Sequence, residues 1–92
     1  MIKITRARYR ESFTIELCFS DGTIGDYDLS SIIARDTVLT RPLTDLGFFQ
    51  SFYLELGALA WPNGLEFSAS AIHKTMLESG RLRSKPRLAQ GA

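Results

Sequence analysis

The sequence lacks most features that would define a secreted, membrane-spanning or disulfide-stabilised protein. Its 92 residues include one cysteine, Cys18, so no disulfide can form within the chain. Secreted domains of this size usually need disulfides, and we therefore expect a cytoplasmic protein in a reducing compartment. The longest nearly apolar run, residues 56–61, is far shorter than the roughly 20 residues that span a bilayer. Basic side chains also interrupt the start of the chain, where a signal peptide would need an apolar stretch. We expect no membrane association.

Reactive side chains are equally scarce. His73 is the only histidine, and a nucleophile needs a base placed beside it. One histidine and one cysteine without a ligand pattern do not predict a zinc site, which needs three or four ligands. No glycine-rich phosphate loop is present. We therefore expect no enzyme, no cofactor and no metal; the remote alternative is a small hydrolase with His73 in an open pocket beside a carboxylate or hydroxyl.

A strong charge of one sign is also missing, because the formal net charge is +1. No global field therefore points to a nucleic acid or a membrane. The charges are nevertheless segregated: all ten acidic residues lie between positions 11 and 80, and both ends of the chain are basic. This composition predicts one domain over residues 1–80 and a flexible basic tail over residues 81–92.

Alternating hydrophobicity is what the sequence does contain. Apolar residues recur at every second position from 13 to 19, which predicts a strand with one buried face. Segments 2–9 and 23–29 are expected to form the two neighbouring strands. In segment 2–9 the apolar residues change from even to odd positions, and a bulge near Thr5 or Arg6 would keep them on one face of the sheet. Asp21-Gly22 predicts a tight turn between the second and third strands, because both residues tolerate positive φ. The N-terminal part is thus expected to be a three-stranded meander.

The second half predicts short helical turns, a later hairpin and one longer helix. The turns are expected after Ser30 or Ser31 and from Pro42 to Leu46, and the hairpin over residues 52–61. Apolar residues at helical spacing predict a helix from Ser68, its N-cap, to Gly80. The expected fold is α+β, with an antiparallel β-sheet of about five strands covered on one face by the C-terminal helix and the short turns. The expected core is Ile4, Phe13, Ile15, Leu17, Phe19, Leu29, Ile33, Leu46, Phe49, Phe52, Leu54, Trp61, Ile72 and Met76.

Four sequence segments resemble a family of small, uncharacterised bacterial domains. The matching segments are Phe19-Ser20-Asp21-Gly22, Asp28-Leu29, residues 43–49 and Trp61 to Glu66, which begins with Trp-Pro-Asn-Gly. The resemblance covers roughly residues 2–77. It implies an α+β fold and no established activity; some relatives carry a helix-turn-helix segment, and some lie beside a small toxin-like partner and are suspected antitoxins. This chain departs from the pattern at Glu66 and His73, and nothing after Gly80 could form a helix-turn-helix, which argues against a repressor.

The leading functional hypothesis is a non-enzymatic protein-interaction module, in its specific form an antitoxin-like member of a bacterial toxin–antitoxin pair. The open face or an unpaired edge of the sheet would also suit a homodimer. The alternative is a nucleic-acid-binding domain that uses the basic N-terminal strand and the tail. The candidate interaction residues are Arg6, Arg8, Arg10, Trp61, Asn63, Arg81, Arg83, Lys85 and Arg87. For Trp61 and Asn63 the competing interpretation is structural: the tryptophan anchors a strand, and the turn redirects the chain into the last helix.

Overall fold

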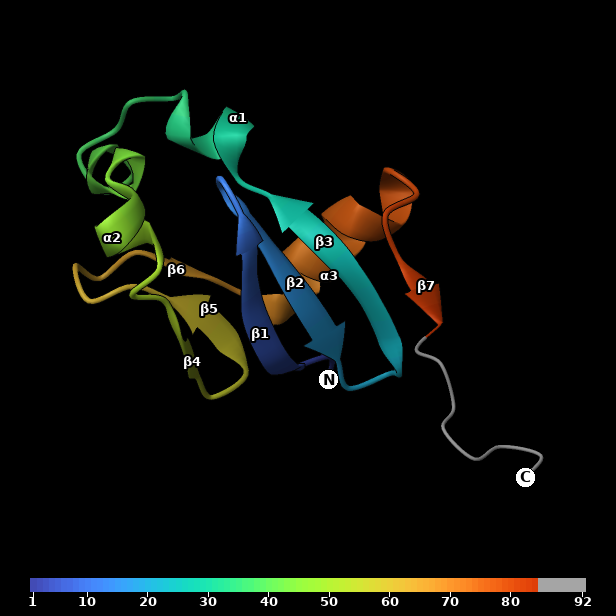
Figure 1. Ribbon diagram of the computed structural model, residues 1–92. Helices are drawn as coiled ribbons and strands as arrows, with labels where there is room; N and C mark the ends of the chain where they lie inside the picture. The colour runs from blue at the N-terminus through green and yellow to red at the C-terminus, as the bar shows by residue number, and fades with distance from the viewer. Residues whose placement is uncertain (85–92) are drawn as a thin grey trace.

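The computed structural model describes residues 1–84 and shows an α+β fold with two antiparallel sheets (Figure 1). The predicted class is confirmed, whereas the single sheet of about five strands is wrong. The first sheet has the strand order β1-β2-β3-β7 and the second the order β4-β5-β6. The strands are β1 (Ile4–Glu11), β2 (Thr14–Phe19), β3 (Thr23–Asp28), β4 (Tyr53–Glu55), β5 (Ala58–Ala60), β6 (Glu66–Phe67) and β7 (Arg83–Ser84).

The first three strands form the expected meander. The register of β1 against β2 shifts between Ile4 and Arg6, so the predicted bulge is confirmed. The turn between β2 and β3 differs in detail from the expected two-residue turn. The Gly22 N–H donates to the Phe19 carbonyl at 3.0 Å, and only Gly22 has a positive φ, of 87°. The loop therefore spans three residues and uses one left-handed glycine rather than two left-handed positions.

The second sheet arises because Trp-Pro-Asn-Gly closes a hairpin instead of ending one. The Gly64 N–H donates to the Trp61 carbonyl, and the Trp61 N–H donates to the Leu65 carbonyl at 2.9 Å. With Gly64 at φ +94°, this loop repeats the geometry of the β2–β3 turn. It returns the chain as β6, which pairs with β5. The first sheet contacts the second where the Ile4 N–H donates to the Gly57 carbonyl at 2.9 Å.

The long helix α3 (Ala69–Glu78) begins and ends where the sequence predicts. The Ser68 hydroxyl accepts a hydrogen bond from the Ala71 N–H, as an N-cap does. At the other end Gly80 has φ +71°, and the N–H groups of Gly80 and Arg81 donate to the carbonyls of Leu77 and Met76. The helix crosses behind the first sheet in Figure 1.

The short helices are α1 (Ser30–Ile33), the 3-10 turn η1 (Arg41–Thr44) and α2 (Leu46–Phe49). The N-cap of α1 is Leu29 rather than a serine, and the Asp28 carboxylate just before it accepts from both the N–H and the hydroxyl of Ser30. Leu46 was expected in the core, but 42% of it is exposed. The reason is that the predicted single helix is divided at Asp45, which caps α2, so that Leu43 on the preceding turn is the buried leucine.

All the other expected core residues are confirmed as buried or packed against buried residues. Phe49 lies at the centre of an aromatic cluster, with ring centroids within 6.5 Å of four other rings. Those four rings belong to Tyr9, Phe13, Phe52 and Trp61. The sequence analysis did not place Leu43, Leu59 or Leu65 in the core, and all three are buried.

Candidate functional site

The three N-terminal arginines share the outer face of the first sheet, as their alternate spacing predicts. Arg8 lies opposite Glu16, and Glu16 lies opposite Asp26 on β3. An Arg8 guanidinium nitrogen is 3.1 Å from a Glu16 carboxylate oxygen, and Arg10 is 3.9 Å from Glu16 and 3.8 Å from Asp26. Exposed pairs of this kind contribute only about 0–1 kcal/mol to stability. They nevertheless direct two arginines toward carboxylates of the same sheet.

Trp61 is enclosed in the fold, and Asn63 is half-buried at its surface. The Trp61 side chain is 0% exposed, and its indole N–H donates to the Phe49 carbonyl at 2.8 Å. The Asn63 amide donates to the Leu39 carbonyl and accepts from the Leu65 N–H. Both residues therefore connect the β5–β6 hairpin to the chain before it. Trp61 anchors a strand, as the structural interpretation expects, whereas the turn after it leads into β6 rather than directly into the last helix.

His73 is partly buried and is bonded to a carboxylate. Its Nε2 lies 2.8 Å from an oxygen of Asp21, and its ring packs edge-on against Phe19. The other Asp21 oxygen accepts from the N–H and the hydroxyl of Thr23. These bonds, chiefly the Thr23 hydroxyl, lower the pKa of Asp21 below its ordinary value. His73 lines neither of the two hollows described below, and the pair connects α3 to the β2–β3 loop.

The chain after Gly80 returns to the first sheet. Arg83 and Ser84 form β7, which pairs with Ile24 and Thr23 at the edge of β3. Leu82 packs against the core. Lys85 and Arg87, the other two cations of the predicted tail, lie outside the described residues.

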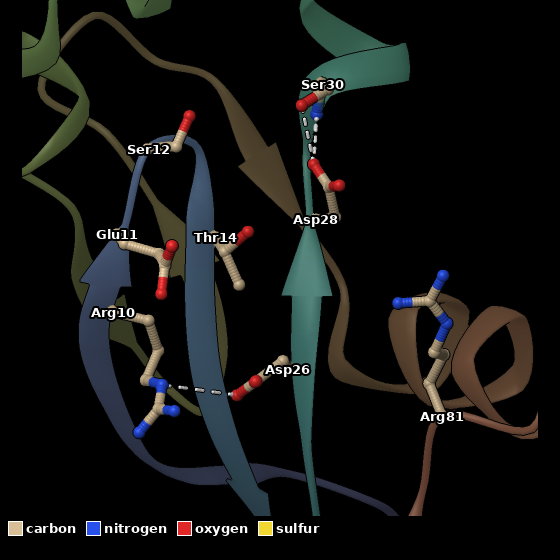
Figure 2. Close-up of a pocket in the computed structure, with 8 residues that line it drawn as sticks. All are labelled: Arg10, Glu11, Ser12, Thr14, Asp26, Asp28, Ser30 and Arg81. Carbon is tan, nitrogen blue, oxygen red and sulfur yellow. Dashed lines mark hydrogen bonds and ion pairs between the residues drawn. The ribbon is translucent and has the colours of Figure 1, made fainter.

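An open polar hollow of about 280 Å³ lies beside β3 (Figure 2). Its floor is the outer face near the β1–β2 turn, and Arg81 approaches it from the end of α3. The lining residues are Arg10, Glu11, Ser12, Thr14, Asp26, Asp28, Ser30 and Arg81. Ser12 at the turn has φ +50°, a conformation that few non-glycine residues adopt.

A second hollow of about 130 Å³ continues from the first along the free edge of β3. The two share Asp26, Asp28 and Arg81. Thr75 of α3 and Ser79, the residue that follows the helix, also line the second. Together we call them the edge groove.

Backbone groups of β3 face this groove. The Leu29 N–H donates to the Phe13 carbonyl, toward β2. Backbone direction alternates along an antiparallel strand, so Asp26 and Asp28 direct their N–H and C=O groups away from β2. β7 pairs only as far as Ile24. Within residues 1–84, no strand pairs with Asp26 or Asp28 on that side.

Two carboxylates of the groove differ in their partners. The Asp28 pKa is lowered by the Ser30 hydroxyl, then by the Ser30 N–H, with a smaller effect from the Arg81 charge. The Oδ1 atom of Asp26 is buried and makes no hydrogen bond to any described residue. Its nearest cation is Arg10, at 3.8 Å. The unpaired oxygen of Asp26 therefore faces Arg10 rather than the free edge of β3 (Figure 2).

Two further features would bear on function in residues 1–84: a metal-ligand cluster and a membrane-spanning helix. No three His, Cys, Asp or Glu side chains among residues 1–84 are placed to hold a metal ion. No helix of the same residues has both the length and the apolar character that crossing a membrane requires.

The fold and groove define a small α+β domain with two antiparallel sheets and a partly unpaired strand edge. The model of one family matches residues 4–75, most of the chain, and its description is "Protein of unknown function (DUF2442)". The chain belongs to this family. No curated protein and no solved structure matches it.

The sequence analysis did not identify the edge groove. It named neither Asp26 nor Asp28 as a candidate interaction residue, and it assigned Arg81 to the tail. The signal present in the sequence was the pair of alternating carboxylates on the last strand of the meander. How much of the edge of that strand stays unpaired depends on β7, which lies about 60 residues later in the sequence and pairs only with the start of β3.

Proposed function

We propose that this domain is a non-enzymatic protein-interaction module that binds an extended segment of a partner protein along the edge groove. The observation that carries the proposal is the unpaired edge of β3, whose outward N–H and C=O groups at Asp26 and Asp28 border a groove walled by α3. An extended peptide can add to such an edge as a further strand, with main-chain hydrogen bonds supplying the affinity.

The specific form of the proposal is an antitoxin-like member of a bacterial toxin–antitoxin pair in the cytoplasm. The resemblance described above supports this form, since some relatives are suspected antitoxins. The ion pairs of Arg8 and Arg10 with carboxylates argue against the nucleic-acid alternative, which needs cations free to meet phosphates. A homodimer through the β3 edge is also unfavourable, because two antiparallel copies would bring Asp26 and Asp28 carboxylates together.

The proposal gives the His73–Asp21 pair a structural role. The histidine connects the middle of α3 to the loop between β2 and β3, and Thr23 bonds the same carboxylate. A general base must reach the proton that it removes in a plausible substrate pose. The groove that we propose as the binding site is lined by other residues.

The test is co-expression with the product of the adjacent gene, followed by purification of a tagged domain at micromolar concentration. Ser79→Trp would fill the edge groove from the α3 side without changing β3. Ser70→Trp, the same substitution near the start of α3 and outside the groove, is the matched control. We expect a stable complex that Ser79→Trp disrupts and Ser70→Trp preserves, with circular dichroism confirming that both variants fold. If the two wild-type proteins do not co-purify, the proposed function is refuted. If the two variants affect the complex equally, the groove is refuted as the binding site.

A further inference from the structure

The chemistry of the edge groove specifies its occupant. We infer that the partner segment is basic, with Lys or Arg at two alternate positions that lie beside Asp26 and Asp28. This inference rests on the proposed function and adds the class of peptide that the edge would accept.

The first argument is the row of charges across the sheet. Arg8, Glu16 and Asp26 occupy successive opposite positions on β1, β2 and β3, so the row ends at the free edge with two carboxylates side by side. Residues directly opposite on neighbouring strands place their side chains on the same face. A residue added opposite Asp26 would therefore extend over the outer face, beside a carboxylate whose nearest cation, Arg10, is shared with Glu16.

The second argument is the exposed part of the Asp26 carboxylate. Its side chain is 42% exposed, and the Arg10 guanidinium is 3.8 Å from Oδ1, too far to donate a hydrogen bond. An ammonium or guanidinium group on an added strand has N–H donors for the exposed oxygen. A carboxylate there would add a like charge.

Alternation along the added strand extends the argument to Asp28. Asp26 and Asp28 lie two residues apart on one face, so their partners are also two residues apart. The residue between them faces the α3 side, where Tyr27, Met76 and Ser79 line the smaller hollow of about 130 Å³. That space suits a small side chain. The expected motif is a basic residue, a small residue and a second basic residue.

The chain itself supplies a precedent on the same edge. β7 pairs antiparallel with β3, and its Arg83 lies opposite Ile24. Ile24 precedes Asp26 by two residues, so its backbone N–H and C=O groups point to the same edge. Arg81 extends toward the groove, where its charge acts on Asp28 (Figure 2). Arg81 thus brings a positive charge, the sign expected of the partner, to the same groove.

The test uses two synthetic peptides and the full chain. The probes are acetyl-Thr-Arg-Ala-Arg-Thr-Val-amide and the same peptide with both arginines replaced by glutamate. Binding is followed by chemical-shift changes of the backbone amides of the ¹⁵N-labelled protein. We expect the basic peptide to shift the Asp26 and Asp28 amides and to bind at least about tenfold more tightly than the acidic one, since each cross-strand ion pair replaces a like-charge repulsion.

Three variants locate the effect. D26N/D28N keeps the side-chain shapes and should weaken binding of the basic peptide about tenfold. E55Q/E66Q removes two exposed acids of the second sheet and should leave binding unchanged. Arg81→Ala should strengthen binding, because the competing cation is removed.

Several outcomes would overturn the inference. They are equal or tighter binding of the acidic peptide, loss of basic-peptide binding in Arg81→Ala, and no shift with either peptide at millimolar concentration. The proposed function fails separately. If the co-expressed complex forms and Ser79→Trp disrupts it while the two peptides bind equally, the interaction module stands and only its basic specificity is refuted.

Discussion

Gly25 is the position where one added carbon should change the fold most clearly. It lies on β3 with its missing side chain directed toward α3. A Cβ atom built there would be 2.2 Å from the Arg81 carbonyl oxygen and 2.9 Å from the Met76 methyl group. The methionine can rotate, but the carbonyl belongs to the backbone at the end of α3. Gly25→Ala therefore requires the helix end and β7 to move away from the sheet.

The expected cost follows from two opposing effects. Overpacking of a filled interior costs about 1–3 kcal/mol, and a clash with backbone belongs at the upper end of that range. Replacing glycine within a strand recovers about 0.5–1 kcal/mol. We expect Gly25→Ala to lower the free energy of unfolding by about 2 kcal/mol. For a domain of this size, the melting temperature should fall by about 8–16 °C.

Urea unfolding followed by Trp61 fluorescence measures this change, because Trp61 is the only tryptophan and is buried. The control is Gly47→Ala in α2, where the nearest atom to the new Cβ would be 3.5 Å away and φ is not positive. Because alanine favours a helix, the control should be neutral or stabilise by up to about 1 kcal/mol. A Gly25→Ala variant within about 0.5 kcal/mol of the wild type would contradict the close packing of α3 on β3.

Three further predictions concern the core and the pH dependence of stability. Trp61→Phe leaves the buried Phe49 carbonyl without its donor and should lower the free energy of unfolding by about 1–3 kcal/mol in urea titrations followed by circular dichroism. Leu43→Ala should cost about 2–5 kcal/mol and Leu46→Ala less than about 1 kcal/mol in the same assay, because only the first is fully buried; equal costs would contradict the assignment of the core. The folded-state pKa of Asp28 is below its ordinary value, so its contribution to stability is present above that value and lost as the pH falls through the folded-state pKa. Asp28→Asn should therefore reduce the loss of stability between about pH 4 and pH 2, as measured by urea unfolding, and an unchanged pH profile would refute this role.

Local patterns in the sequence were sufficient for several elements. Strict alternation over residues 13–19 predicts β2, and the serine and glycine that flank α3 predict both of its ends. The bulge in β1 is visible as a change of apolar parity near Arg6. These features depend on the geometry of a single strand or helix, so neighbouring residues contain all the information.

Features that depend on packing between segments, or on the direction in which a turn leads the chain, were missed or misjudged. The exposure of Leu46 follows from the break at Asp45 and from which leucine the core accepts. Cys18 has the parity of the outer face, yet it is only 6% exposed. Predicting the second sheet would have required knowing that the turn after Trp61 closes a hairpin.

The sequence by itself determined the class of the fold, the meander, the limits of α3 and the shared face of the three N-terminal arginines, since periodicity and capping act within a few residues. Only the tertiary structure decided that Arg8 and Arg10 meet carboxylates, that Trp61 is enclosed, and that β7 covers part of the β3 edge and leaves Asp26 and Asp28 beside a groove. The physical reason is that burial and strand pairing depend on which remote segments occupy the same space. That is a property of the whole packed chain, and no local pattern contains it.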